Sequence, residues 1–267
     1  MRSVNPALPI APYIGGKRNL ARRVCQFIET IDHDGYAEPF VGMGGVFLRR
    51  QQAPKVEVIN DLNRDVATLF RVLQRHYVAF LEMLRFQLSS RAEFDRLMAT
   101  DPETLTDLER AARFLYVQRT AFGGRVSGRN FGVSSRNPGR FDVTRLGSML
   151  EAVHDRLAAV TIECLPWDRF IARYDRPGML FYLDPPYWGS EGDYGKAMFG
   201  RDDFAALAGA LQALQGRFLV SINDVPQIRE LFSWATIEAV ETTYTIGGGR
   251  RATKKARELL ITGSTPC

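Results

Sequence analysis

The most apolar run of the chain, residues 178–183, ends in Asp184-Pro185-Pro186-Tyr187. A carboxylate at the end of a buried strand costs free energy unless it meets a hydrogen-bond donor. The amino group of adenine is such a donor, and it is a poor nucleophile because its lone pair is delocalised into the ring. Asp184 and the Pro185 carbonyl can accept its two N–H bonds, while Tyr187 stacks on the base. The motif indicates activation of an exocyclic amine; the alternative is a rigid strand end with a capping aspartate.

A second motif that could bind a ligand is the glycine loop Gly42-Met43-Gly44-Gly45. Asp61 follows Gly42 by 19 residues. An acidic residue at this spacing is typical of sites that bind ribose hydroxyls. The third glycine of a dinucleotide-binding loop is absent, because Phe47 occupies its position. The pattern therefore favours an adenosine without phosphates, such as S-adenosyl-L-methionine. The alternative is a glycine-rich turn with no ligand.

Positive charge is concentrated in one segment. The chain has a net charge of +5, and residues 110–141 contain seven arginines and no acidic residue. Glycines and phenylalanines are interleaved with these arginines, a combination that suits phosphate contacts, close backbone approach and base contact. This segment predicts a nucleic-acid partner, whereas the alternative is a solvated basic face.

Composition excludes several other classes of protein. No apolar run approaches the roughly 20 residues of a membrane-spanning helix. The three cysteines and three histidines lack the spacing of metal ligands, so we expect no metal. Neither a disulfide framework nor a signal peptide is indicated, and we expect a cytoplasmic location.

The elements that must position these motifs alternate between strands and helices. We expect helices at 17–30, 45–52, 202–214 and 226–233, and strands near 36–41, 55–61, 160–165, 178–183, 217–224, 235–246 and 256–263. Alternation of this kind predicts a doubly wound, Rossmann-like α/β sheet. The last two strands form an antiparallel pair at its edge. Helices and a basic loop interrupt the alternation between residues 65 and 150.

Taken together, the motifs resemble those of the Dam-type, alpha-class DNA adenine-N6 methyltransferases along nearly the whole chain. The matching segments occur in the order of that family: PYIGGKRNL, AEPFVGMGGVFL, VINDLNRDV, RTAFGGRVSGRNFG, LDPPY and SINDVPQIREL. The resemblance implies methyl transfer from S-adenosyl-L-methionine to the N6 amino group of an adenine flipped out of double-stranded DNA. It also implies a catalytic domain of residues 1–64 and 151–267, with a smaller helical and hairpin target-recognition domain inserted at 65–150.

The resemblance further implies roles for individual residues. Asp184, Pro185 and Tyr187 would be catalytic, and Asp184 would touch both substrates. The residues expected at the cofactor are Tyr13, Lys17, Phe40, Gly42, Asp61 and Asp184. The residues expected at DNA are Arg119, Arg125, Arg129, Asn130 and Arg136. Asn130 stands where members that read GATC tend to carry proline, so the target sequence is open.

Three other hypotheses remain. The first keeps the chemistry but acts on RNA or another planar amine. The second is a DNA-binding accessory protein with an inactive methyltransferase fold, and the third is a nicotinamide oxidoreductase.

A monomer is expected, because one flipped base requires no two-fold partner. Residues 188–200, rich in glycine and aromatic residues, can close over the base; the alternative is a surface connection.

Overall fold

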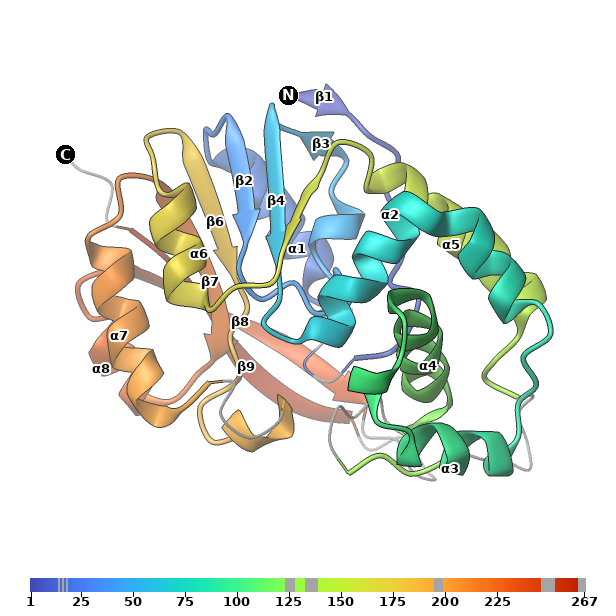
Figure 1. Cartoon of the computed structure of the whole chain (residues 1–267). Helices are drawn as coiled ribbons and strands as arrows, with labels where there is room; N and C mark the ends of the chain where they lie inside the picture. Colours follow the sequence, from blue (N-terminus) through green and yellow to red (C-terminus); the bar gives the residue numbers. More distant parts are fainter. Residues whose placement is uncertain are drawn as a thin grey trace.

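The centre of the molecule is a seven-stranded sheet. Figure 1 shows the computed structural model, which describes residues 1–13, 15, 17, 19–122, 128–132, 139–194, 199–245 and 253–263. In order across the sheet, the strands are β5 (Thr161–Glu163), β4 (Val56–Asn60), β2 (Gly35–Glu38), β6 (Met179–Leu183), β7 (Arg217–Asn223), β9 (Thr253–Thr262) and β8 (Thr236–Thr245). The first five are parallel, whereas β9 is antiparallel to both neighbours. The doubly wound α/β fold and the antiparallel pair at the sheet edge are confirmed.

The strand order reverses direction at the middle of the sheet. From β2 the chain proceeds outward to β4 and β5, then returns to β6 beside β2 and continues outward to β7 on the other side. In sheets of this kind, ligands bind beyond the carboxyl ends of the strands at this switch point. The loops after β2, β4 and β6 therefore surround one position.

Both faces of the sheet are covered. In β6, Leu180 and Tyr182 pack into the hydrophobic cluster on one face, whereas Phe181 and Leu183 pack into the cluster on the other. The cluster on the first face also contains residues of α1 (Ala21–Thr30), α2 (Arg64–Leu84), α3 (Arg91–Ala99), α4 (Asp107–Thr120) and α5 (Val143–Arg156); the cluster on the second face contains residues of α6 (Trp167–Tyr174), α7 (Arg201–Gln212) and α8 (Pro226–Leu231). This burial on both faces explains the uninterrupted apolar sequence of β6.

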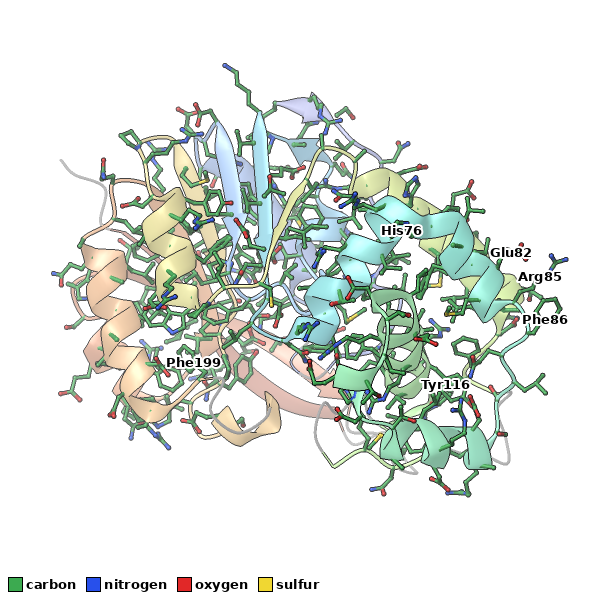
Figure 2. The ribbon with its side chains drawn as sticks, viewed as in Figure 1. His76, Glu82, Arg85, Phe86, Tyr116 and Phe199 are labelled. Atoms are coloured by element: carbon green, nitrogen blue, oxygen red, sulfur yellow. The ribbon has the colours of Figure 1, made fainter. Side chains whose placement is uncertain are left out.

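The helices α2 to α5 form a group beside the sheet (Figure 1). Asn63 caps α2, and Thr106 and Glu109 form a reciprocal capping box at the start of α4. The helix α2 is kinked at His76, which Figure 2 labels. After α4, Ala121 pairs with Phe131 in an isolated antiparallel bridge between two positions within the basic segment.

Two expected elements differ in the structure. The helix expected at 17–30 begins at Ala21. The helix expected after the glycine loop is a single 3-10 turn, Phe47–Arg49, followed by the short strand β3 (Gln52–Ala53), which pairs with β1 (Arg2–Ser3). The backbone becomes extended at Arg50, whose buried guanidinium bonds Glu57, and this inward turn ends the helical conformation. The helix α6 was not expected from the sequence.

Candidate active site

A cavity of about 950 Å³ lies at the switch point of the sheet. It is lined by the N-terminal segment and by the loops after β2, β4 and β6. All the residues expected at the cofactor are in its wall: Tyr13, Lys17, Phe40, Gly42, Asp61 and Asp184. Residues separated by up to 171 positions in the sequence thus surround one space, as the resemblance implied, while their individual roles stay predictions.

Two glycines of the glycine loop have backbone conformations that favour glycine. Gly42 and Gly44 have φ values of +50° and +72°, which side-chain-bearing residues rarely adopt. A Cβ on Gly42 would lie 3.2 Å from the Tyr13 ring, and a Cβ on Gly44 would lie 2.7 Å from the side chain of Leu48. The loop is therefore tightly turned, and the absence of a side chain at Gly42 lets the aromatic ring pack against the backbone.

Asp61, directly after β4, holds the glycine loop. Its Oδ2 accepts a hydrogen bond from the Gly42 backbone N–H at 2.8 Å, and its Oδ1 accepts one from the Asn63 backbone N–H, also at 2.8 Å. Burial raises the pKa of Asp61 to about 6, and these two hydrogen bonds oppose the rise. Each carboxylate oxygen keeps a second lone pair that can accept a hydroxyl from a ligand.

Asp184, directly after β6, has its two oxygens in different environments. Oδ1 lies 2.5 Å from Lys17 Nζ and 3.5 Å from the hydroxyl of Ser221, which in turn bonds Tyr182. The same lysine donates a hydrogen bond to the Tyr187 hydroxyl at 2.8 Å and lies 4.5 Å from the centre of that ring. Among the described residues no hydrogen bond involves Oδ2, which is therefore the oxygen available to a substrate.

The ionisation of Asp184 is set by opposing influences. Burial raises its pKa to about 6, the ammonium of Lys17 lowers it, and the carboxylate of Glu258 raises it further. Near neutral pH the group is mostly ionised, because its pKa lies below 7. The site therefore contains a poorly solvated carboxylate that is a strong hydrogen-bond acceptor.

The turn that follows Asp184 is fixed by β7. Asn223 accepts a hydrogen bond from the Trp188 backbone N–H at 2.9 Å and donates one to the Trp188 carbonyl at 3.1 Å. Pro185 and Pro186 are buried, and Pro186 forms part of the cavity wall. Tyr187 thus lies between the Asp-Pro-Pro sequence and Trp188, whose backbone is hydrogen-bonded to Asn223. Residues 195–198 of the expected closing loop lie outside the described residues.

Several residues of the cavity were not expected from the sequence. Glu38, at the end of β2, is 2% exposed, and its Oε2 has no hydrogen-bond partner among the described residues. Burial raises its pKa well above the ordinary value, against the charge of Arg50. Phe199 (Figure 2) meets Phe40 edge to face, with ring centres 5.7 Å apart, and Trp167 lies beside it. Glu38 stands directly before Pro39-Phe40 in a recognised segment, and that position was the available signal.

The residues expected at DNA have different environments. Arg119 lies in the cavity wall, where it donates hydrogen bonds to the carbonyls of Ile10 and Arg140. Arg129 bonds the side-chain oxygen of Gln118 at 2.9 Å, and Asn130 is exposed. Arg125 and Arg136 lie outside the described residues.

Comparison with known proteins decides the family. A family model described as D12 class N6 adenine-specific DNA methyltransferase matches residues 13–246, which include the glycine loop, Asp61 and Asp184. The chain belongs to this family. The resemblance noted in the sequence is therefore confirmed, and the enzyme is an adenine-specific DNA methyltransferase.

Individual relatives support this membership over nearly their full length. The Type II methyltransferase M1.LlaDCHI of Lactococcus lactis subsp. cremoris is 26% identical over 95% of this chain and 94% of its own. The Type II methyltransferase M.CviBI of Paramecium bursaria Chlorella virus NC1A is 24% identical over 84% of this chain and 86% of its own. A DNA adenine methylase of Haemophilus influenzae is 24% identical over 97% and 96%, respectively.

Within the part of the enzyme that the structure describes, no three His, Cys, Asp or Glu residues form a group that could hold a metal ion. Likewise, none of the helices in the described ranges combines the length and apolar character needed to cross a membrane.

Proposed function

We propose that the enzyme transfers a methyl group from S-adenosyl-L-methionine to the N6 amino group of an adenine flipped out of duplex DNA. The observation that carries this proposal is the arrangement of Asp184. Its Oδ1 is occupied by Lys17 and Ser221, while Oδ2 accepts no hydrogen bond from the described residues. An amino N–H of the target base supplies the donor that this oxygen lacks.

The cavity fits the expected cofactor on three grounds. A Cβ on Gly42 would contact the Tyr13 ring at 3.2 Å, the Asp61 carboxylate keeps two lone pairs for ribose hydroxyls, and the buried Glu38 has an oxygen without a hydrogen bond among the described residues, which suits an ammonium group. Phe40, with Phe199 beside it, offers an aromatic surface for a base. When bound, S-adenosyl-L-methionine supplies an electrophilic methyl group on its sulfonium.

The residues around Asp184 make the amine nucleophilic. Hydrogen bonds from N6 to Asp184 Oδ2 and to the Pro185 carbonyl favour a pyramidal nitrogen whose lone pair points at the methyl group. Lys17 holds Oδ1 and the Tyr187 hydroxyl together, so the carboxylate and the stacking ring keep a fixed relative position. Because a low-dielectric site strengthens such hydrogen bonds, the buried carboxylate is suited to stabilising positive charge that develops on N6.

We further propose that residues 1–64 and 151–267 form the catalytic domain and residues 65–150 the target-recognition domain. The helices α2 to α4, the bridge between Ala121 and Phe131 and the whole basic segment fall in the second part, which supports this division. There the residues that contact DNA are Arg119, Arg125, Arg129, Asn130 and Arg136, with Arg119 doing so from the cavity wall. We expect a monomer that acts in the cytoplasm of a bacterial or phage-infected cell.

The test is transfer of labelled methyl from S-adenosyl-L-methionine to unmethylated duplex DNA, with mapping of the modified base. We expect methyl on adenine N6 within a short sequence, loss of transfer in Asp184→Ala, and retention in Asp202→Ala, which changes an exposed residue of α7. Parallel reactions contain RNA and free nucleotides. Transfer to RNA alone, or binding of DNA and cofactor without transfer, would overturn the proposal.

A further inference from the structure

Glu258 reaches the active site from β9, the last strand of the chain. It is 1% exposed, and its Oε2 lies 3.6 Å from Lys17 Nζ. The same ammonium lies 2.5 Å from Asp184 Oδ1. Because the side chain of Lys17 is 1% exposed and that of Asp184 is 20% exposed, these charges are largely shielded from water. Two carboxylates from different strands therefore share one ammonium in the wall of the cavity.

The strand pairing fixes where Glu258 lies. In the sheet it stands opposite Asn223 of β7 and Val240 of β8. Asn223 is the residue that bonds both backbone groups of Trp188. The paired positions on β7 and β9 thus support the Asp-Pro-Pro-Tyr turn in two ways, one through its backbone and the other through the cation that contacts Asp184.

The groups that face Asp184 come from every neighbouring element. Glu38 contributes a carboxyl from β2, Tyr182 a hydroxyl from β6 and Ser221 a hydroxyl from β7, while Lys17 and Glu258 contribute charges. Tyr187 contacts Lys17 from the same turn. When ionised, Asp184, Lys17 and Glu258 carry a net charge of −1.

We propose that Glu258 is a positioning residue for Asp184: by sharing Lys17, it directs the ammonium to Oδ1 without neutralising the aspartate, so that Oδ2 keeps its negative charge for the target amino group. This inference rests on the proposed methyl transfer. As the N6–C bond forms and the S–C bond breaks, N6 becomes positively charged and then loses one proton to solvent. An exclusive Lys17–Asp184 pair would be neutral and would stabilise that positive charge less.

The test measures kcat and KM for duplex DNA from pH 5 to 8 in the wild-type enzyme, Glu258→Gln and Glu258→Asp. We expect Glu258→Gln to lower kcat about tenfold, equivalent to one pKa unit of interaction, with little change in KM. The acid limb of its pH profile should move to lower pH, because the Glu258 carboxylate raises the pKa of Asp184 in the wild type and its loss lowers that pKa. Glu258→Asp keeps the charge and should retain the wild-type limb and more of kcat.

Glu241→Gln is the matched control, because Glu241 lies on the neighbouring strand β8 with 66% of its side chain exposed. A wild-type enzyme that transfers no methyl would refute the proposed function itself. An active wild type with unchanged kcat and pH profile in Glu258→Gln would overturn the role of Glu258. Equal losses in the Gln and Asp variants with an unmoved acid limb would also overturn it, since they would indicate packing alone. If Glu258→Gln does not fold, the comparison of Glu258→Asp with wild type still decides, because retention of the wild-type limb and kcat supports the role and a shifted limb opposes it.

Discussion

The side-chain amide of Gln118 donates a hydrogen bond to the Pro12 carbonyl at 2.8 Å, and its oxygen accepts one from Arg129 at 2.9 Å. Gln118 is fully buried near the end of α4. The first bond holds the segment that carries Tyr13 and Lys17, whereas the second holds Arg129 of the basic segment. One side chain therefore connects the proposed cofactor pocket to the proposed DNA-binding segment.

We expect Gln118→Leu to weaken the coupling between DNA and cofactor. Loss of a hydrogen bond costs about 0.5–1.5 kcal/mol, and the variant loses both of the bonds described above. The factor by which duplex DNA tightens cofactor binding, measured by calorimetry with and without DNA, should shrink. Gln212→Leu, at an exposed position of α7, is the control. An unchanged factor in Gln118→Leu would show that the two bonds serve packing only.

The substitution Asp61→Asn should weaken cofactor binding. Both oxygens of Asp61 accept backbone N–H groups, and asparagine offers one acceptor, so its NH₂ must face either Gly42 or Asn63. We expect the Kd for S-adenosyl-L-methionine to rise by at least about tenfold, equivalent to one lost hydrogen bond. Asp168→Asn, on the exposed face of α6, should leave calorimetric binding unaltered. Equal affinity in the two variants would contradict the role of Asp61.

The substitution Gly42→Ala should weaken cofactor binding by more than its backbone strain alone would. The positive φ costs a residue with a side chain about 1–2 kcal/mol, and the new methyl group would also press on the Tyr13 ring. Gly128 is the matched control, because its φ of +59° is similar and nothing lies within 4 Å. We expect Gly42→Ala to bind cofactor more weakly than Gly128→Ala in the absence of DNA. Equal binding would indicate backbone strain alone.

Methyl transfer should decline as the pH falls through about 6, where Asp184 becomes protonated. A protonated carboxyl accepts hydrogen bonds poorly, and the ordinary pKa of aspartate would place this decline near pH 4. The measurement is kcat at saturating DNA between pH 5 and 8. Full activity at pH 5 would show that the ionised form is not required.

The same raised pKa predicts a stability effect of defined sign. Between pH 4 and 6, the folded enzyme binds a proton at Asp184 more tightly than the unfolded chain does, because the pKa is about 6 in the folded enzyme and 3.8 for an ordinary aspartate. Stability contributed by this group therefore decreases as the pH rises through that interval. In urea unfolding, Asp184→Asn should lose less stability than wild type over the interval. A steeper loss of stability with rising pH in the variant than in the wild type would show that folding does not raise the pKa of Asp184.

Local sequence was sufficient to predict a conformation where that conformation depends only on residues of the same segment. The apolar run before Asp184 predicts a strand buried on both faces, and β6 is such a strand. The glycines at 42 and 44 predict a tight loop, and both have positive φ. In each case, the conformation depends on neighbouring residues, so it could be inferred without knowing the rest of the fold.

Other parts of the site depend on contacts between distant segments. Glu258 meets Lys17 only because β9 pairs with β7, and no local pattern marks that glutamate. The expected helix after the glycine loop failed for a similar reason, since Arg50 turns inward to reach Glu57. Sequence periodicity reports local preference, whereas these outcomes were decided by buried charges that must find partners.

The position of β9 between β7 and β8 has a consequence for synthesis on the ribosome. Because β8 precedes β9 in the chain, the edge of β7 stays open until the last strand emerges and inserts. An open edge is a template for pairing with another chain. A nascent chain stalled before residue 253 would expose that edge and lack Glu258 at the same time. A chain that terminates before residue 253 should therefore yield aggregates rather than a partly active enzyme.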